Sequence, residues 1–263
     1  MMAVQIIPTS FQSEGEVIQG HFVLPTGKGP FPGICKFHGL PGSPDQVSGF
    51  ATRLAQIGFA ILTFDFRGFR ASQGRWSLAG EVKDAYHAVS HLLTSKYTKA
   101  DWVGVYGASY GGAVAVLAAI RDPRISALCL RAPVYDTLEF VLSPVFELGL
   151  TELLCTAPNQ IHGITDPEER KVIIERVIHE SKILNPINEI VKMSPCPLFV
   201  ITGDADAGIP VEGVRRLFNR APEPKELVVI EGADHNLSTP QAFEDTVGAV
   251  QNWFLSQISE PRG

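Results

Sequence analysis

Short apolar segments, each long enough for one strand, recur along the chain and alternate with segments of helical spacing. The apolar segments are GICKFHG (33–39), AILTFDFRG (60–68), WVGVYGA (102–108), ALCLRAP (127–133), PLFVITGD (197–204) and ELVVIEGA (226–233). They are almost continuously apolar, which is typical of strands that are covered on both faces. Helical spacing is found at 46–56, 78–94, 110–121, 211–220 and 240–258. The alternation predicts an α/β fold with a mostly parallel, doubly wound sheet.

The N-terminal segment has a different pattern. Residues 5–10 and 16–24 are rich in β-branched and aromatic side chains, and the polar sequence SEGE lies between them. This arrangement predicts two paired strands that precede the alternating part of the chain.

One long segment, residues 134–194, interrupts the alternation. Its apolar positions recur at helical spacing, and Asp166 followed by Pro167 is typical of a helix N-cap and first turn. We expect two or three helices here, forming a lid over the carboxyl edge of the sheet. The core would then consist of residues 1–133 and 195–263. The alternative is a connecting subdomain that only completes the packing.

Composition and charge exclude several classes of protein. Hydrophobic residues make up 45% of the 263 residues and charged residues 19%, which is ordinary for a globular protein. The net charge is -6 and the 22 basic residues are scattered, so no nucleic-acid partner is expected. The sequence also has no evident secretory signal and no apolar stretch long enough for a membrane span. These features predict a cytoplasmic protein, and they leave the oligomeric state open.

The cysteines are too far apart to suggest a shared site. Cys35, Cys129, Cys155 and Cys196 form no Cys-x-x-Cys pair, so neither a zinc site nor a redox pair is indicated. We expect reduced, mostly buried thiols. No metal and no cofactor is predicted.

The segment GASYGG places Ser109 between Gly107 and Gly111, where an apolar strand gives way to a helix. A serine at such a turn is held in a strained backbone conformation that exposes its hydroxyl above the sheet, and the glycines allow the strand and helix to approach. This context predicts a nucleophile. The alternative is a glycine-rich turn in which Ser109 only caps the helix.

A serine nucleophile needs a histidine that accepts its proton. His235 follows the last apolar strand, at the sheet edge where Ser109 is expected, and is therefore the best candidate. His38 ends an earlier strand, within a turn that suits another role. The others are interpreted as ordinary surface or core side chains: His21, His87, His91, His162 and His179.

The histidine in turn needs a carboxylate that orients it. The loop GDADAGIP offers Asp204 and Asp206, and both could instead be turn formers. We favour Asp206 and keep Asp204 as the alternative. The resulting chain order of Ser109, Asp206 and His235 is the one expected for a nucleophile on this kind of sheet.

Acyl transfer also requires hydrogen-bond donors for the negative charge that develops on the carbonyl oxygen. The backbone N–H of Tyr110, directly after the nucleophile, is one candidate. The N–H of Leu40 in HGLPG is the second, because Gly39 and Gly42 let the backbone approach a ligand. The alternative for HGLPG is an ordinary turn between a strand and a helix.

Taken together, HGLPG, DFRGFRAS, GASYGG, GDADAGIP and ADHN resemble the motifs of the α/β-hydrolase family, in the family's order and over nearly the whole chain. The resemblance implies a serine hydrolase in which Ser109 is the nucleophile, His235 the general base and Leu40 with Tyr110 the oxyanion hole. The family's Gly-x-x-Asp-x-x-hydrophobic-Pro pattern places the acid on Asp206.

Within that family, the short helical insertion is similar to the small lid of cinnamoyl esterases. SYGG also resembles prolyl oligopeptidase-like enzymes, which normally carry a large additional domain that this chain is too short to hold. Ser109 disfavours dehalogenases and epoxide hydrolases, whose nucleophile is aspartate, and dienelactone hydrolases, whose nucleophile is cysteine.

The predicted activity is hydrolysis of small to medium acyl or aryl esters through an acyl-enzyme. A small-substrate peptidase or a thioesterase on the same triad is the first alternative, and a protein that binds ligands without turnover is the second. Seven residues are candidates for an apolar acyl pocket, with plain core packing as the alternative: Phe69, Trp76, Phe140, Val141, Phe146, Leu148 and Leu150.

Overall fold

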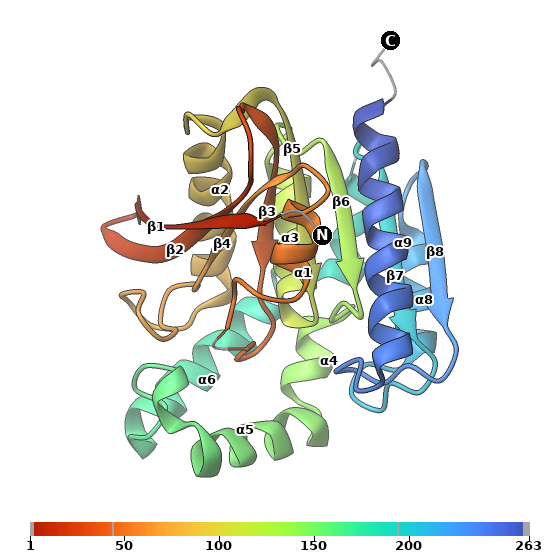
Figure 1. Ribbon diagram of the computed structural model, residues 1–263. Coiled ribbons are helices and arrows are strands. Elements are labelled where there is room, and N and C mark those ends of the chain that lie inside the picture. Colours follow the sequence, from red (N-terminus) through yellow and green to blue (C-terminus); the bar gives the residue numbers. More distant parts are fainter. Residues whose placement is uncertain (1–2, 44, 194, 260–263) are drawn as a thin grey trace.

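Eight strands form one sheet in the computed structural model of the chain, which describes residues 3–43, 45–193 and 195–259. The ends of the expected core, residues 1–2 and 260–263, and the end of the expected insertion, residue 194, lie outside the described part. The strands are β1 (Val4–Ser13), β2 (Glu16–Pro25), β3 (Phe31–Phe37), β4 (Ala60–Phe64), β5 (Thr98–Ala108), β6 (Ala127–Arg131), β7 (Leu198–Gly203) and β8 (Lys225–Ile230). Their order across the sheet is β1-β2-β4-β3-β5-β6-β7-β8 (Figure 1).

The sheet is antiparallel only at the edge that β1 and β2 form. β1 pairs with β2, and β2 with β4, in antiparallel register, whereas every other neighbouring pair is parallel. β4 and β7 are buried along their whole length, as their continuous apolar sequences require. The predicted α/β fold with a mostly parallel sheet is therefore confirmed.

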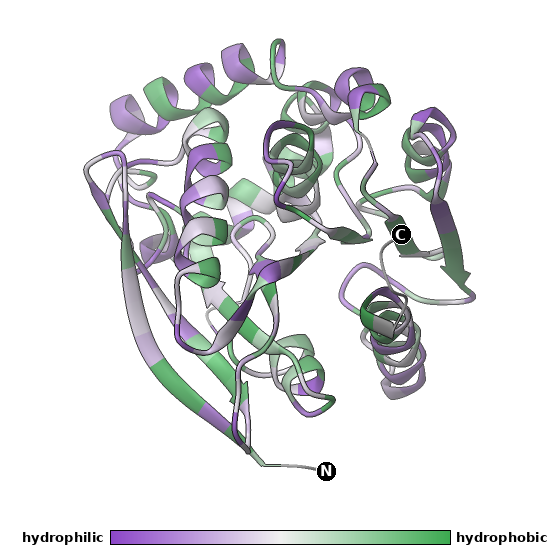
Figure 2. Ribbon diagram, turned by 90° about the horizontal axis from the view of Figure 1, so that it is seen from above, coloured by the Kyte–Doolittle hydropathy of each residue, from purple (hydrophilic) through white to green (hydrophobic). Residues whose placement is uncertain are grey.

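Helices cover both faces of this sheet. Five helices lie in the segments that were predicted to be helical: α1 (Phe50–Ala55), α2 (Leu78–Leu93), α3 (Tyr110–Arg121), α8 (Val211–Arg220) and α9 (Pro240–Ser259). α1 and α9 pack on one face, while α2, α3 and α8 pack on the other. Several of these outer helices carry hydrophilic and hydrophobic segments in alternation (Figure 2). The carboxyl ends of the parallel strands are left free for a site at one edge.

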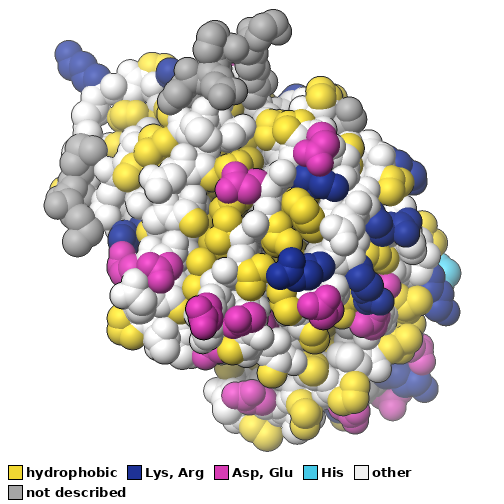
Figure 3. All heavy atoms as spheres, turned by 90° about the vertical axis from the view of Figure 1, so that its right-hand side faces the viewer, with side chains coloured by type: hydrophobic (Ala, Val, Ile, Leu, Met, Phe, Trp, Pro, Cys, Tyr) yellow, Lys and Arg dark blue, Asp and Glu magenta, His cyan; other side chains and the backbone are white. Residues whose placement is uncertain are grey.

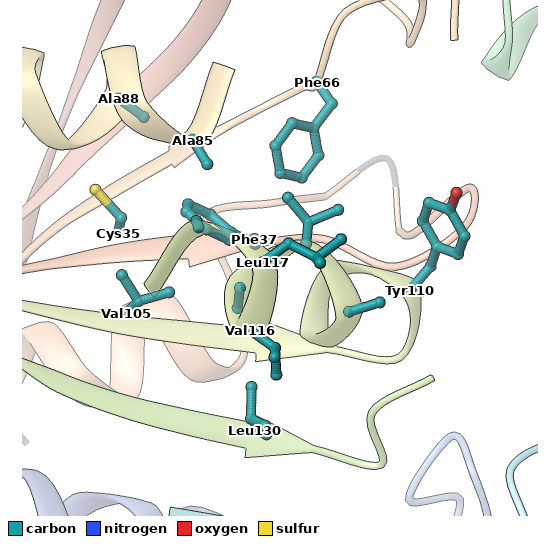
Figure 4. Packing of buried hydrophobic residues seen from close by; sticks show 14 of the residues in the cluster. Cys35, Phe37, Phe66, Ala85, Ala88, Val105, Tyr110, Val116, Leu117 and Leu130 are labelled. Carbon is teal, nitrogen blue, oxygen red and sulfur yellow. The ribbon is translucent and has the colours of Figure 1, made fainter. Parts of the chain in front are cut away.

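The larger buried cluster lies between the central strands and the helices α2 and α3. Figure 4 shows Cys35 and Phe37 of β3 and Val105 of β5 in this cluster. Val116 of α3 and Ala85 of α2 belong to the same cluster. The small side chains on the two helices allow them to pack closely on the sheet.

Two predicted boundaries are wrong in ways that bear on the site. The strand expected over 60–68 ends at Phe64, because the N–H of Phe66 donates to His38 and that of Arg67 to Asp84 instead of to a neighbouring strand. The helix expected from residue 46 begins only at Phe50. The residues before it form a loop at the carboxyl end of β3.

Four α-helices, and not the two or three expected, fill the described part of the segment that interrupts the alternation. They are α4 (Thr137–Val141), α5 (Pro144–Thr156), α6 (Pro167–Ser181) and α7 (Pro186–Glu189), with short 3-10 turns at Pro158–Gln160 and Ile190–Lys192. Asp166 caps α6 as predicted, since its side chain accepts a hydrogen bond from the N–H of Glu169. Figure 1 shows α4, α5 and α6 beyond the carboxyl ends of the parallel strands.

The described surface agrees with the charge pattern of the sequence. On the face in Figure 3, Lys and Arg side chains are intermixed with Asp and Glu. Among the described helices, each is too short or too polar to cross a bilayer. Cys35, Cys129 and Cys196 are buried as expected, whereas Cys155 of α5 is exposed.

Candidate active site

Ser109 occupies the turn between β5 and α3 in a strained backbone conformation. Its φ is 53° and its ψ is -123°, and such a positive φ is uncommon for a residue other than glycine and costs about 1–3 kcal/mol. Two backbone hydrogen bonds hold this turn. The N–H of Ser109 donates to the carbonyl of Arg131 over 2.9 Å, and the N–H of Val134 donates to the carbonyl of Ser109 over 2.9 Å. β6 and the residues after it therefore support the half-buried serine.

The two flanking glycines are required by close packing around this turn. A Cβ on Gly107 would lie 2.6 Å from the carbonyl oxygen of Gly111, and a Cβ on Gly111 would collide with the carbonyl oxygen of His38. The first turn of α3 thus lies directly against both β5 and the end of β3. The two glycines therefore allow the strand and the helix to pack closely around the turn that carries Ser109.

The structure brings His235 and Asp206 to Ser109. His235 Nε2 lies 3.1 Å from Ser109 Oγ, and His235 Nδ1 lies 2.6 Å from Asp206 Oδ2. Because an ionised carboxylate only accepts hydrogen bonds, Nδ1 carries the proton and Nε2 presents its lone pair to the serine hydroxyl. The three side chains form one hydrogen-bonded line from a buried carboxylate to the hydroxyl.

Asp206 is held rigidly in this line. Its side chain is fully buried, and its second oxygen accepts hydrogen bonds from the N–H groups of Gly208 (2.9 Å) and Ile209 (2.7 Å). Asp204, the alternative candidate, instead accepts a hydrogen bond from the N–H of Gly232 over 2.6 Å. Asp204 thus links the loop after β7 to the loop after β8, whereas Asp206 faces the histidine.

The two predicted oxyanion-hole residues lie on either side of Ser109. Tyr110 is the first residue of α3, so its N–H lies at the positive end of the helix dipole. A Cβ on Gly39 would be only 3.1 Å from the Cβ of Ser109, which places the following residue, Leu40, beside the serine. Leu40 lines the same space as Ser109 and His235.

His38 supports the turn that carries Leu40. Its Nε2 accepts a hydrogen bond from the N–H of Phe66 over 3.0 Å, so Nδ1 carries the proton and donates to the carbonyl of Gly39 over 2.7 Å. Burial, reinforced by the charge of Arg70, lowers the pKa of His38 well below its ordinary value. A neutral His38 therefore fixes the turn, and its place at the end of a strand was the only sign of this role in the sequence.

An apolar cavity of about 510 Å³ opens beside Ser109 under the inserted helices. It is lined in part by Trp76, Phe140, Phe146, Leu150, Leu153 and Ile209. Three of the seven residues expected here lie elsewhere: Phe69 and Val141 are buried in the core, and Leu148 is 71% exposed on α5. Helical spacing alone could not show which side of α5 faces the site.

A second cavity, of about 550 Å³, opens on the other side of Ser109; it has charged and polar side chains among its apolar ones and is called the polar cavity below. Lys36, Tyr106 and Arg131 contribute to it, and none of the three was expected at the site from the sequence. The available signal was the single charged residue near the end of each of two otherwise apolar strands, GICKFHG and ALCLRAP. Within the described residues, no three His, Cys, Asp or Glu side chains are grouped so that they could hold a metal ion.

A model of the prolyl oligopeptidase family matches residues 46–260, which is most of the chain. The chain belongs to this family. Ser109, Asp206 and His235 all fall within the matched residues, whereas Leu40 precedes them. Together with the fold, the match identifies the chain as a hydrolase of the α/β-hydrolase superfamily, as the sequence motifs implied.

The chain is similar to several proteins, some of which are named as hydrolases. The chain is 28% identical to Uncharacterized protein YfhR of Escherichia coli O157:H7 over 255 residues, 94% of this chain and 79% of YfhR. It is 25% identical to 2,6-dihydropseudooxynicotine hydrolase of Paenarthrobacter nicotinovorans over 214 residues, 81% of this chain and 54% of that protein. Est1E from Butyrivibrio proteoclasticus, solved with ferulic acid, has a TM-score of 0.73 and 17% identity, covering 96% of this chain and 100% of Est1E. The last likeness concerns the fold.

Proposed function

We propose that this chain is a serine esterase that hydrolyses small to medium acyl or aryl esters through a covalent acyl-enzyme. The observation that carries the proposal is the line from buried Asp206 through His235 to Ser109, which ends beside an apolar cavity large enough for such groups. A strained, half-buried serine that is hydrogen-bonded to a histidine and borders a cavity has no evident use in packing.

In the first step, Ser109 Oγ attacks the ester carbonyl carbon while His235 Nε2 takes the hydroxyl proton. The negative charge that forms on the carbonyl oxygen is stabilised by the N–H groups of Tyr110 and Leu40, where each such donor is typically worth about 2.7–4 kcal/mol. Asp206 stays ionised and stabilises the imidazolium. His235 then gives its proton to the departing alcohol oxygen as the ester bond breaks.

In the second step, a water molecule takes the place of the alcohol. His235 Nε2 accepts a proton from this water as its oxygen attacks the acyl carbon, and the bond to Ser109 Oγ breaks as the serine regains its proton. Neither step calls for a metal ion or an organic cofactor, because the serine and histidine supply both the nucleophile and the proton transfers.

The inserted helices act in this proposal as a lid that supplies the acyl site. α5 contributes Phe146, Leu150 and Leu153 to the apolar cavity, and α4 contributes Phe140. Residues 134–194 would therefore set which acyl groups fit, while the core supplies the reacting groups. The likeness of this insertion to the small lid of cinnamoyl esterases favours ester substrates.

Intact mass after exposure to a fluorophosphonate tests the proposal. We expect a single covalent adduct on the wild-type protein, no adduct on Ser109→Ala, and release of nitrophenol from 4-nitrophenyl butyrate by the wild type alone. His21→Ala serves as a matched control, because His21 lies in β2, three strands away from β5 and its serine in the sheet. An unlabelled wild type would refute the proposal and leave a protein that binds ligands without turnover.

Peptides are a second candidate class of substrate, because the family that the chain matches is named for an oligopeptidase. Thioesters are a third, because the same acyl-enzyme forms from them. A comparison of kcat/KM for butanoyl compounds that differ only in an ester, thioester or anilide leaving group separates these activities. Faster turnover of the anilide than of the ester would replace the esterase proposal by a peptidase.

A further inference from the structure

The polar cavity lies across Ser109 from the apolar one. Five residues border both cavities: Leu40, Pro41, Gly42, Ser109 and His235. A molecule whose ester bond lies at Ser109 can therefore extend into both cavities at once. The apolar side suits a hydrocarbon, so the question is which chemical group the polar side accommodates.

The sheet register directs three polar side chains into this cavity. Lys36 of β3 and Tyr106 of β5 are direct partners, and Tyr106 also pairs with Cys129 of β6. Arg131 follows Cys129 by two residues, so it has the same orientation, because side chains two apart on a strand share a face. Lys36, Tyr106 and Arg131 thus lie on one face of the sheet, near the carboxyl ends of three adjacent strands.

The two cations have neutral partners. Lys36 Nζ donates to the Oε1 atom of Gln46 over 2.7 Å, and Arg131 Nη1 donates to the carbonyl of His235 over 2.7 Å. Among the residues that the structure describes, neither cation forms an ion pair. Nearby Arg70, in contrast, is paired with Asp65 over 2.6 Å.

A buried hydroxyl completes the polar wall. Tyr106 is 1% exposed, and the guanidinium of Arg131 lies close to its hydroxyl, although no well-formed hydrogen bond joins the two. The aromatic ring of Phe50 stacks on Tyr106 at 5.0 Å, and Phe243 meets Phe50 edge to face at 5.5 Å. A buried polar group without a partner is costly unless a ligand supplies one.

One carboxylate also borders the cavity and must be counted. Asp45 lies in an exposed loop, where its Oδ1 already accepts hydrogen bonds from the N–H groups of Val47 and Ser48. Two cations and one anion leave a net positive charge. Lys36 and Arg131 each use one donor in their hydrogen bonds to neutral partners, so their other N–H groups remain available to an anion.

We propose that the polar cavity binds a carboxylate on the alcohol half of the substrate, so that the preferred substrates are esters of hydroxy-carboxylic acids with an apolar acyl group. The inference rests on the proposed esterase activity. The alcohol half is assigned to the polar side because water replaces it before the second step, and a polar cavity is hydrated more readily than an apolar one. The aromatic walls favour an aryl carboxylate.

A matched pair of esters tests the inference. 4-(Butanoyloxy)benzoate and 4-(butanoyloxy)benzamide share the acyl group and differ in the charge of the leaving half. We expect kcat/KM for the benzoate to exceed that for the benzamide by about tenfold or more, since hydrogen bonds to charged groups are the stronger ones. In Lys36→Met the ratio should fall several-fold, whereas Lys99→Met, at an exposed lysine of β5, should retain it.

Protection from labelling gives a readout besides turnover. 4-Hydroxybenzoate should slow fluorophosphonate labelling of the wild type more than 4-hydroxybenzamide does, and Lys36→Met should lose this difference while still being labelled. Equal rates for the two esters, or a ratio that Lys36→Met leaves unchanged, would overturn the inference and leave the esterase proposal intact. A stronger preference for 4-(butanoyloxy)phenyl phosphate would overturn the carboxylate assignment. Absence of both labelling and turnover would instead overturn the proposed activity.

Discussion

The two sides of Ser109 have cavities of similar size that differ in the charged side chains they contain. The apolar cavity of about 510 Å³ is built largely by α4 and α5 of the insertion, whereas the polar cavity of about 550 Å³ is built by the ends of β3, β5 and β6 with their loops. The charged groups thus come from the rigid sheet, and the apolar groups come from inserted helices. Under the proposed activity, this division would allow changes in the insertion to alter the acyl preference without disturbing the polar side.

Each side also buries an ionisable group, with different results. Glu81 of α2 lies below the apolar side, where burial and the neighbouring charge of Asp84 raise its pKa well above the ordinary value, so the neutral acid is favoured. On the polar side, burial and the charge of Arg70 lower the pKa of Lys36, but only to about 8. Lys36 therefore keeps its charge at neutral pH. Buried Glu81 thus favours its neutral form, whereas Lys36 beside the polar cavity keeps its charge.

A substitution in the triad, which lies between the two cavities, should lower the turnover of all substrates equally and give the largest effect. Asp206→Asn keeps the shape of the side chain but favours the wrong tautomer of His235, so we expect kcat to fall by about 10³- to 10⁴-fold. Rates with both esters of the matched pair measure this, and their ratio should stay constant. Asp204→Asn, in the same loop, is the control and should retain most of the activity. A loss in Asp204→Asn as large as that in Asp206→Asn would contradict the assignment of the acid.

Much of the triad could be predicted from the sequence, because its position depends on short motifs and on where buried strands end. The glycines around Ser109 predict a close strand-to-helix turn, and continuous apolar segments predict buried parallel strands whose carboxyl ends meet at one edge. Asp206 and His235 follow strands that end there. The geometry agrees with these expectations because each of them depends only on chain direction and on a short motif.

The walls of the two cavities were much less predictable. Lys36 and Arg131 stand alone in apolar strands, and only the pairing of β3, β5 and β6 brings them to one face. On α5, helical spacing did not distinguish the lining residue Phe146 from exposed Leu148, because the insertion packs against the core on several sides. Long-range register and the orientation of one helix decide these positions, and neither is encoded locally.

Removing one apolar wall should change the acyl preference alone. Phe146 lies between Trp76 and Phe140, with ring centroids at 6.2 and 5.7 Å. We expect Phe146→Ala to reduce the preference for hexanoyl over acetyl esters by about tenfold, because hydrophobic pockets discriminate by roughly 1–3 kcal/mol per methylene. Measurement of kcat/KM for 4-nitrophenyl acetate and hexanoate gives this preference.

The control for that change lies two residues away on the same helix. Leu148→Ala removes an apolar side chain that is exposed on α5, so the acyl preference should stay within about twofold of that of the wild type. An equal loss of preference in both variants would mean that α5 acts through its stability. The benzoate to benzamide ratio should be the same in both variants, because neither residue borders the polar cavity.

The smallest expected effect is a change of the benzoate preference with pH. Lys36 is charged below its pKa of about 8 and neutral above it, whereas the benzoate carboxylate stays ionised from pH 6.5 to 9.5, a range in which ordinary carboxyl groups, with pKa values of roughly 4, have lost their proton. The ratio of kcat/KM values for benzoate and benzamide should therefore be highest near neutral pH and fall a few-fold as the pH rises through 8. His235 is the proposed base in both reactions, so its contribution cancels in the ratio.

The charges around Lys36 set how far that ratio falls. Arg131 and Arg70 lower the pKa of Lys36, while Asp45 and Asp65 raise it. Arg131 stays charged throughout the range, as arginine does in proteins, so part of the preference should persist at high pH. Because kcat/KM follows the protonation state of the free enzyme, the fall should be centred on the pKa of unliganded Lys36, about 8. In Lys36→Met the ratio should be independent of pH, and a pH dependence equal to that of the wild type would assign the effect to a group other than Lys36.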